Sequence, residues 1–260
     1  MFQVPAQAYD GWIGRYSTHL AGALIEFVGI EPKSKVLDVG CGPGALSAAL
    51  VGRVGASNVY AVDPSQPFVE ACRQRLPGVN AIVASAESLP FPDGEFDAAL
   101  AQLVVNFMSD PEAGVREMAR TTRAGGTVAA CVWDYGGEMT LLRGFWDAAR
   151  EVEPVSGAAG DEAAVMKWSG EGDLAELWQL AGLTEVRFRD LQVSAPYENY
   201  DELWAPLKSG VGPAGAFYEA LDDEGRGELY EAFRRRLGVG DGPFELTARA
   251  WAAAGTVAAS

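Results

Sequence analysis

The sequence predicts an α/β fold, a doubly wound and mostly parallel seven-stranded sheet with an antiparallel C-terminal strand and helical cap insertions. Three observations predict it. Short apolar segments alternate with helical segments over residues 35–134, a glycine-rich turn follows the first apolar segment, and two more strand-like segments occupy 183–193 and 244–257. Strands that alternate with helices at this spacing are typical of a parallel sheet with right-handed crossovers.

The elements follow in order along the chain. Residues 8–29 carry apolar side chains at helical spacing and predict one or two helices closed by Gly29. The apolar run 35–40 has the character of a buried parallel strand, because it contains few polar side chains and ends in glycine. The alternation then predicts helices at 45–53, 67–76 and 111–123, the last closed by Ala124-Gly125-Gly126, and strands at 58–63, 80–86, 96–104 and 127–134.

The regular alternation stops after Trp133. Residues 135–172 combine helical stretches with a Gly/Ala-rich link at 156–164, and residues 173–182 form an amphipathic helix. The segment between the last two strands is helical with a glycine-rich middle, Gly210 to Gly215. No internal repeat is visible, and 260 residues suit one α/β domain with insertions.

Composition excludes several classes of partner. With 36 acidic and 20 basic residues, the formal net charge is −16, which repels phosphate backbones and anionic headgroups. The basic run 234–236 lies among acidic helical residues and is interpreted as a solvated helix face. We therefore expect neither nucleic acid nor membrane as a partner. The three cysteines lack CxxC spacing and no signal pattern is visible, which favours reduced thiols and a cytoplasmic location.

The strongest local signal is VLDVGCGPG, residues 36–44. Gly40, Gly42 and Gly44 allow positive φ and close approach of a ligand, and the start of the following helix offers unpaired N–H groups. A dinucleotide-binding turn has the pattern GxGxxG, whereas this turn is GxGxG preceded by Asp38. Nineteen positions after Gly44, Asp63 ends the second strand, where a carboxylate can bind both hydroxyls of a ribose or cap the next helix.

Four segments in this order resemble the motifs of class I SAM-dependent methyltransferases, which have a Rossmann-like fold. They are VLDVGCGPG, AVDPS, the segment from Ser85 to Pro111 and TTRAGGTVAACVWD. More narrowly, they resemble the branch of ubiquinone/menaquinone-type methyltransferases and their small-molecule relatives. The specific match covers about residues 30–134. The resemblance implies S-adenosyl-L-methionine (SAM) as cofactor and S-adenosyl-L-homocysteine as product.

The resemblance also implies roles for individual residues. The backbone of Gly40, Cys41 and Gly42 would contact the methionine part of SAM, Asp63 the ribose, and Ala86 the adenine ring through its N–H, with Pro64, Ser65 and Glu87 nearby. Many relatives have an aspartate before that alanine, which binds the adenine amino group. Here the residue is Ser85, so that contact shifts to Glu87 or weakens. The methyl end of the cofactor would be lined by Ala101, Gln102 and Leu103.

The N-terminal segment resembles one that folds over the cofactor in some members. Tyr9, Arg15 and Tyr16 are the candidates to cover SAM, and the alternative is a packed aromatic pair with a surface arginine. His19, the one histidine, is a weak candidate for a general base, because a lone histidine on such a helix is more often a surface or core residue. The catalytic residues stay unassigned. No cluster has metal-ligand spacing, so we expect no metal.

These expectations divide one methyltransferase domain, 1–260, into a helical lid (1–29), a SAM-binding core (30–134), a helical cap (135–172 and 194–240) and the last helix and strands (173–193 and 241–260). The expected function is methylation of a small-molecule acceptor, apolar or aromatic, by a monomer or homodimer. The alternatives are a dinucleotide-dependent oxidoreductase and a catalytically silent SAM-binding protein.

Overall fold

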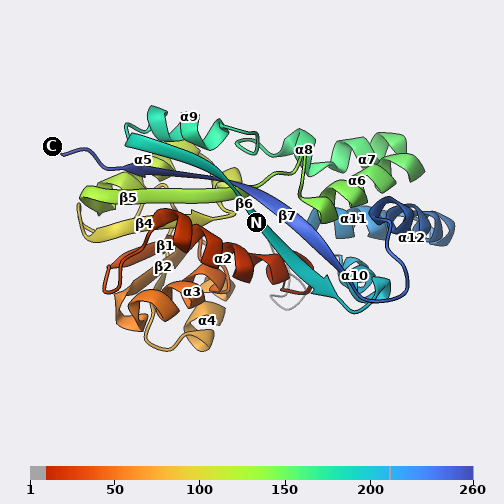
Figure 1. The fold of residues 1–260 in the computed structure, drawn as a ribbon, viewed down its shortest axis with the longest axis horizontal. Coiled ribbons are helices and arrows are strands. Elements are labelled where there is room, and N and C mark those ends of the chain that lie inside the picture. Colours follow the sequence, from red (N-terminus) through yellow and green to blue (C-terminus); the bar gives the residue numbers. More distant parts are fainter. Residues whose placement is uncertain (1–9, 211, 260) are drawn as a thin grey trace. The chain divides into compact units, whose positions relative to one another are not determined.

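The computed structural model describes residues 10–210 and 212–259, and within them a seven-stranded sheet with the order β3-β2-β1-β4-β5-β7-β6 (Figure 1). The pairs β1–β2, β2–β3, β1–β4 and β4–β5 are parallel, and β5–β7 is antiparallel. This confirms the predicted fold class. The strands are β1 (Val36–Val39), β2 (Val59–Asp63), β3 (Asn80–Val83), β4 (Phe96–Gln102), β5 (Thr122–Trp133), β6 (Thr184–Tyr197) and β7 (Phe244–Thr256).

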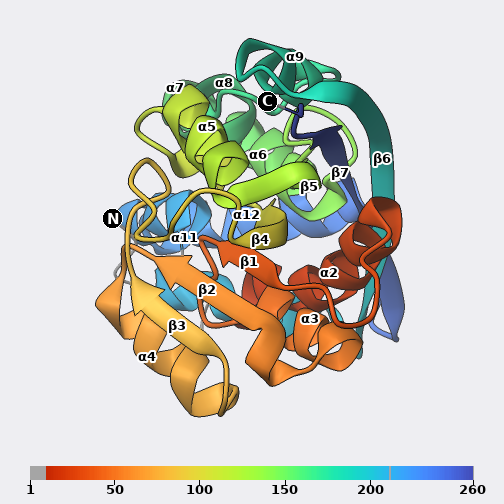
Figure 2. The ribbon, with the colours of Figure 1, turned by 90° about the vertical axis from the view of Figure 1, so that its left-hand side faces the viewer.

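The chain divides into two compact units, and the larger one comprises Ser17–Trp133, Trp168–Leu191 and Ala250–Ser260. Its helices lie on both sides of the sheet, with α2 and α3 on one side and α5 and α9 on the other (Figure 2). Buried apolar side chains of β1, β4 and β5 form the core between these layers. The helices are α2 (Arg15–Val28), α3 (Ala45–Val54), α4 (Gln66–Arg75), α5 (Pro111–Thr121) and α9 (Asp173–Leu180), with a π-helical turn η1 (Asp10–Gly14) before α2.

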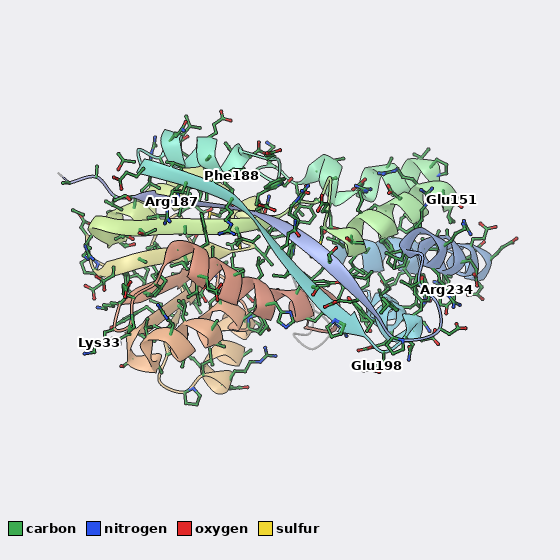
Figure 3. The ribbon with its side chains drawn as sticks, viewed as in Figure 1. Lys33, Glu151, Arg187, Phe188, Glu198 and Arg234 are labelled. Carbon is green, nitrogen blue, oxygen red and sulfur yellow. The ribbon has the colours of Figure 1, made fainter. Side chains whose placement is uncertain are left out.

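Strand β6 forms one edge of the sheet, and its side chains alternate between two environments (Figure 3). Phe188 stacks on Trp251 of β7 with ring centroids 5.4 Å apart, whereas the guanidinium of Arg187 lies 5.3 Å from the ring centroid of Phe27 in α2. Successive residues of a strand point to opposite faces of the sheet, so Phe188 and Arg187 make their contacts on opposite faces.

The smaller unit comprises Met1–Tyr16, Asp134–Lys167 and Gln192–Arg249, and in its described part it is mainly helical. At its centre, the ring of Phe145 meets those of Trp146, Phe217 and Phe233 edge-to-face, with centroids 5.0 to 6.1 Å apart. Each such pair stabilises the fold by about 0.5–1.5 kcal/mol beyond the contribution of its buried area. The helices are α6 (Thr140–Val152), α7 (Pro154–Gly160), α8 (Glu162–Val165), α10 (Tyr200–Trp204), α11 (Gly212–Ala220) and α12 (Asp223–Leu237), with a 3-10 turn η4 (Ala205–Ser209).

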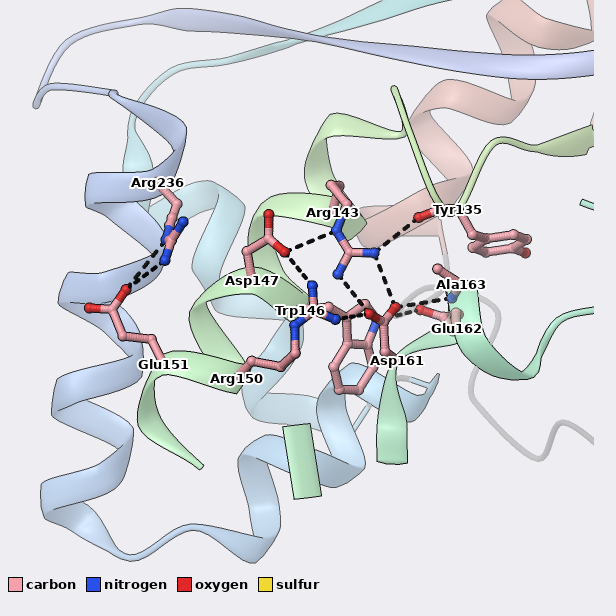
Figure 4. A network of polar contacts seen from close by, with 10 residues as sticks. All are labelled: Tyr135, Arg143, Trp146, Asp147, Arg150, Glu151, Asp161, Glu162, Ala163 and Arg236. Atoms are coloured by element: carbon pink, nitrogen blue, oxygen red, sulfur yellow. Dashed lines mark hydrogen bonds and ion pairs between the residues drawn. The ribbon is translucent and has the colours of Figure 1, made fainter. Parts of the chain in front are cut away.

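Polar side chains connect the helices of this unit (Figure 4). Asp161 accepts a hydrogen bond from Arg143 Nη2 at 2.7 Å and is also paired with Arg150, while the indole of Trp146 donates to Glu162 at 3.0 Å. Burial raises the pKa of Glu162 to about 7, and the nearby charge of Asp161 acts in the same direction, although the bond from Trp146 lowers it. The network therefore places two carboxylates with opposite pKa shifts side by side, because the arginines lower the pKa of Asp161 despite its burial.

Two local expectations were wrong. The Gly/Ala-rich stretch 156–164 is not a link but contributes to α7 and α8, because glycine lets α7 approach α6: a Cβ on Gly157 would lie 2.6 Å from the backbone of Ala149. Helix α5 ends at Thr121, and Ala124-Gly125-Gly126 lies within β5 instead of closing the helix. A Cβ on Gly126 would lie 2.6 Å from the carbonyl oxygen of Asp97, so this glycine allows the strand to approach β4 at a shift in register.

Candidate cofactor site

The turn after β1 requires glycine for two different reasons. Gly40, Gly42 and Gly44 have φ of 73°, 52° and 100°, which side chains with a Cβ rarely adopt. At Gly40 space is also lacking, since a Cβ there would lie 2.4 Å from Cγ2 of Val104. The N–H groups of Gly40 and Cys41 both donate to the carbonyl oxygen of Val62, at 2.8 and 2.9 Å, which fixes the turn against β2.

Asp63 lies at the end of β2 and is directly bonded to this turn. Its Oδ2 accepts the N–H of Gly42 at 2.9 Å, and its Oδ1 accepts the N–H of Ser65 at 2.8 Å. The side chain is buried, and burial raises its pKa although both hydrogen bonds act in the opposite direction. A carboxylate offers about four acceptor positions, so about two remain for the hydroxyls of a ribose. Pro64 beside it is exposed and Ser65 is half-buried.

Asp38 belongs to the same site but was not among the predicted site residues. It is 1% exposed in β1, and its Oδ2 accepts the hydroxyl of Ser47 at 2.6 Å, while its Oδ1 has no hydrogen-bond partner in the described residues. Burial raises the pKa of Asp38 to about 7, against the effect of the Ser47 bond. An acidic residue inside an otherwise apolar strand, two positions before the glycine turn, is the signal that identifies it in the sequence.

The loop after β3 contains Ser85, Ala86 and Glu87. Ala86 is buried, and its N–H donates to no other described atom. The carboxylate of Glu87 accepts one hydrogen bond from the backbone N–H of Ser109, at 2.8 Å, and another from the hydroxyl of Ser85. The two polar side chains considered for the adenine amino group are thus bonded to each other.

The end of β4 carries the third group of predicted residues. Ala101 is fully buried, and Gln102 is 9% exposed with its Nε2 donating to the carbonyl oxygen of Ser17 at 3.0 Å. Because a carbonyl oxygen only accepts, this bond fixes the orientation of the carboxamide, and Oε1 has no partner within the described residues. Leu103 has φ of 62°, an uncommon conformation for leucine and one that clusters at functional sites.

The N-terminal candidates Arg15 and Tyr16 belong to the smaller unit and contact other residues of that unit. Arg15 donates to Glu202 at 3.0 Å and to the carbonyl oxygen of Pro196 at 2.8 Å, and its guanidinium lies 4.3 Å from the ring centroid of Tyr197. The hydroxyls of Tyr16 and Tyr197 are 3.1 Å apart. Tyr9 lies outside the described residues. Their role in covering the cofactor stays a prediction, as does that of His19, which is exposed on α2.

Other site chemistries are limited by what the described part of the chain contains. It holds no group of three or more His, Cys, Asp or Glu side chains placed to bind a metal ion. All three cysteines are free and buried. Over the same residues, no helix combines the length and apolarity that a membrane span needs.

The fold and site together define a Rossmann-like nucleoside-binding domain. The sheet order differs from the 3-2-1-4-5-6 order of dinucleotide-binding domains by its antiparallel β7 between β5 and β6, which disfavours the oxidoreductase alternative. Residues 37–130 match the model of the methyltransferase domain. This match, the fold and the named methyltransferases among the relatives support a class I SAM-dependent methyltransferase with SAM as its cofactor.

Individual proteins are similar to this chain in sequence or in fold. The chain is 28% identical to a demethylmenaquinone methyltransferase of Clavibacter sepedonicus over 70% of this chain and 74% of the relative. It is 26% identical to a malonyl-[acyl-carrier protein] O-methyltransferase of Halorhodospira halophila over 80% and 68%. The structure resembles that of the YcgJ protein from Bacillus subtilis, with a TM-score of 0.58 and 19% identity, covering 93% and 99% of the two chains.

Proposed function

We propose that this chain transfers the methyl group of SAM to a small-molecule acceptor with apolar or aromatic character. The observation that carries the proposal is the bond between Asp63 and Gly42, which unites the ribose-binding carboxylate and the glycine turn in one cradle while leaving acceptor positions on the carboxylate. The net charge of −16 argues against nucleic acid as the acceptor.

The residues around the cradle receive distinct roles in this proposal. The backbone of Gly40, Cys41 and Gly42 holds the methionine part, and Asp63 holds the ribose. The N–H of Ala86, which has no acceptor among the described residues, is suited to a ring nitrogen of adenine, with Pro64, Ser65 and Glu87 alongside. The methyl end lies against Ala101, Gln102 and Leu103, and Tyr9, Arg15 and Tyr16 belong to the lid.

The acceptor's character is inferred from aromatic side chains and relatives. Phe107, which follows β4 beyond Gln102, is 46% exposed and offers an aromatic side chain to an apolar acceptor. The two relatives named above are, by their names, methyltransferases for demethylmenaquinone and for the malonyl group of a carrier protein. We assign selection of the acceptor to the cap segments 135–172 and 194–240 of a single methyltransferase domain.

The chemistry asked of the protein is mainly positioning. Bound SAM supplies a methyl group that its sulfonium already makes electrophilic, so an acceptor carbon, oxygen or nitrogen held in line can attack it. The chain's own residues bind the two ends of the cofactor, orient the acceptor and exclude water. A dedicated base is not required, in agreement with the exposed position of His19.

The experiment is methyl transfer from SAM labelled in its methyl group to three sets of acceptors: quinols and phenols, carboxylic acids including acyl-carrier thioesters, and nucleic acid. We expect label in the first set, and an Asp63→Ala variant as the matched control should transfer at least about tenfold less at limiting SAM. Label that appears only in nucleic acid would refute a small-molecule acceptor. Binding of S-adenosylhomocysteine without transfer to any set would favour the silent SAM-binding alternative.

A location in the cytoplasm and a monomeric or homodimeric state are also proposed. Three free cysteines support a reducing compartment. Sedimentation of the purified chain with and without cofactor determines the oligomeric state.

A further inference from the structure

The loop after β3 is polar, but its side chains are already bonded. Ser85 is exposed, yet its hydroxyl is bonded to the carboxylate of Glu87, and its oxygen also lies 3.4 Å from the N–H of Glu87. The other oxygen of Glu87 accepts the N–H groups of Ser109 and Asp110, at 2.8 and 3.3 Å. The serine and the glutamate therefore connect the loop after β3 to the segment after β4.

The two acidic side chains at this place, Glu87 and Asp110, are bonded to backbone N–H groups of the segment after β4. Partial burial raises the pKa of Glu87. The hydrogen bonds from Ser85 and from the backbone N–H groups of Ser109 and Asp110 lower it by more, so the net shift is downward. Asp110 caps α5, with its Oδ1 accepting the N–H of Ala113 at 3.0 Å. A capping carboxylate stabilises the start of its helix, which opposes its recruitment by a ligand.

Ala86, between the two polar residues, offers a donor instead of an acceptor. A Cβ added to Gly114 of α5 would lie 3.6 Å from the Cβ of Ala86, in ordinary contact, so the alanine side chain packs toward the helix. Its backbone N–H donates to no other atom of the described residues. Adenine presents a ring nitrogen, N1, that accepts a hydrogen bond, and beside it a 6-amino group that donates. The loop complements the first with this N–H, whereas its one carboxylate, that of Glu87, is already bonded to three donors.

We infer that this enzyme reads the adenine of its cofactor through N1 at Ala86 and leaves the 6-amino group unread by any side chain. It therefore accepts SAM analogues in which that amino group is removed or substituted. The inference rests on the proposed placement of the adenine beside Ala86. It assigns Ser85 and Glu87 a positioning role in the loop, not a contact with the base.

Calorimetry with three ligands separates the two edges of the base. The ligands are S-adenosylhomocysteine, its analogue with unsubstituted purine, which keeps N1 as an acceptor, and its analogue with hypoxanthine, in which N1 carries a hydrogen. We expect the purine analogue to bind within about threefold of S-adenosylhomocysteine, and the hypoxanthine analogue at least about tenfold more weakly, because two donors would then face each other.

Variants make the comparison internally controlled. Glu87→Gln keeps an oxygen for Ser109 and should leave the ratio between S-adenosylhomocysteine and the purine analogue near one. Adding Ser85→Asp to Glu87→Gln places a carboxylate beside the base and should raise that ratio to about tenfold or more, the usual effect of a hydrogen bond to a charged group. An unchanged ratio in a folded double variant would overturn the inference.

A tenfold preference of the unmodified enzyme for S-adenosylhomocysteine over the purine analogue also overturns it. If that preference disappears in Glu87→Gln, then Glu87 leaves Ser109 and binds the amino group. These results differ from a failure of the proposed function, in which S-adenosylhomocysteine itself would not bind to the folded protein.

Discussion

The carboxylate of Asp63 accepts the backbone N–H of Gly42 at 2.9 Å and so joins the end of β2 to the turn after β1. It adds a side-chain contact to the two backbone bonds by which Gly40 and Cys41 hold the same turn against Val62. A ligand that binds Asp63 and the turn together finds both already held in place, which lowers the entropy lost on binding.

Replacing Asp63 by alanine should weaken binding of S-adenosylhomocysteine at least tenfold while the protein stays folded. The loss of a hydrogen bond from a charged group costs about 1.5–3 kcal/mol. Calorimetry measures the affinity, and circular dichroism checks the fold. Asp93→Ala is the matched control, because that side chain is 81% exposed and pairs with Arg120 away from the turn. Equal affinities for the Asp63 variant and the wild type would remove Asp63 from the site.

Substitution of Gly40 by alanine should disrupt the turn more than the same change at another left-handed glycine. At Gly40 the new Cβ would lie 2.4 Å from Val104, whereas at Gly29, with φ of 78°, nothing lies within 4 Å. Gly29→Ala therefore has only the conformational cost of about 1–2 kcal/mol, and Gly40→Ala has that cost and a steric clash. Thermal unfolding compares the two variants. Val104→Ala added to Gly40→Ala should recover part of the stability, and no recovery would contradict the clash.

The sequence predicts those parts of the site that depend on contacts between residues close together in the chain. The turn from Gly40 to Gly44 and the terminal position of Asp63 follow from local pattern, because glycine content and strand ends are local properties. Family resemblance added Ala86 and Gln102. The bond from Glu87 to Ser109 spans 22 residues and depends on how two loops meet at the sheet edge, which no local pattern specifies.

The same limit explains the elements that were misassigned. In the sequence, Gly157 and Gly126 indicate the end of a helix or a link, because glycine weakens isolated helices and strands. In the structure each of them lies against a backbone, that of Ala149 or Asp97, so the absence of a Cβ permits packing. The pairing of Arg15 with Glu202 joins residues 187 positions apart and could not be predicted from the N-terminal segment.

Asp38 should make the cofactor-free protein less stable as pH rises from about 4 to 7. Its pKa is raised by burial to about 7 in the folded state and is 3.8 as the ordinary value, so in this range the folded state binds the proton and the unfolded state does not. Stability is then lost with increasing pH, by at most about 4 kcal/mol, and no further loss from this group occurs above the folded pKa.

Urea unfolding of the wild type and of Asp38→Asn between pH 4 and 8 measures this effect. Asparagine can still accept the Ser47 hydroxyl but does not titrate, so the variant should lose less stability over the range. The pKa of Glu162 is also raised to about 7, so this residue too lowers the stability as pH rises. The two proteins are therefore compared in a Glu162→Gln background. Parallel curves for the two proteins would show that Asp38 titrates normally.

Methyl transfer should be independent of divalent metal. Within the described residues, no cluster of His, Cys, Asp or Glu is placed to bind an ion, and positioning of SAM and acceptor needs none. We expect the same rate after dialysis against a chelator as before. Activity that disappears with chelator and returns with magnesium would contradict this and would indicate an acceptor bound through a metal, as a catechol can be.

Residues 8–19 should become protected from hydrogen exchange when S-adenosylhomocysteine binds. The cofactor motifs are complete between Val36 and Trp133, so the N-terminal segment is available as a lid, and its closure would exclude water from the methyl transfer. Gln102, at the methyl end of the proposed site, already donates to the carbonyl oxygen of Ser17 in α2 at 3.0 Å. A cofactor that orders Gln102 would therefore order α2 through this bond.

The exchange experiment compares the free protein with the protein saturated with S-adenosylhomocysteine, by peptide mass spectrometry. We expect about tenfold slower exchange in residues 8–19 and around Gly40 and Asp63, while the cap segments 135–172 and 194–240 respond mainly to acceptor. Gln102→Leu, which removes the bond to Ser17, is the matched variant and should lose protection in the N-terminal segment while keeping it at Asp63. If residues 8–19 exchange equally fast in both states, the contacts of Arg15 and Tyr16 with Tyr197 are ordinary packing. Tyr9, Arg15 and Tyr16 would then not belong to the cofactor site.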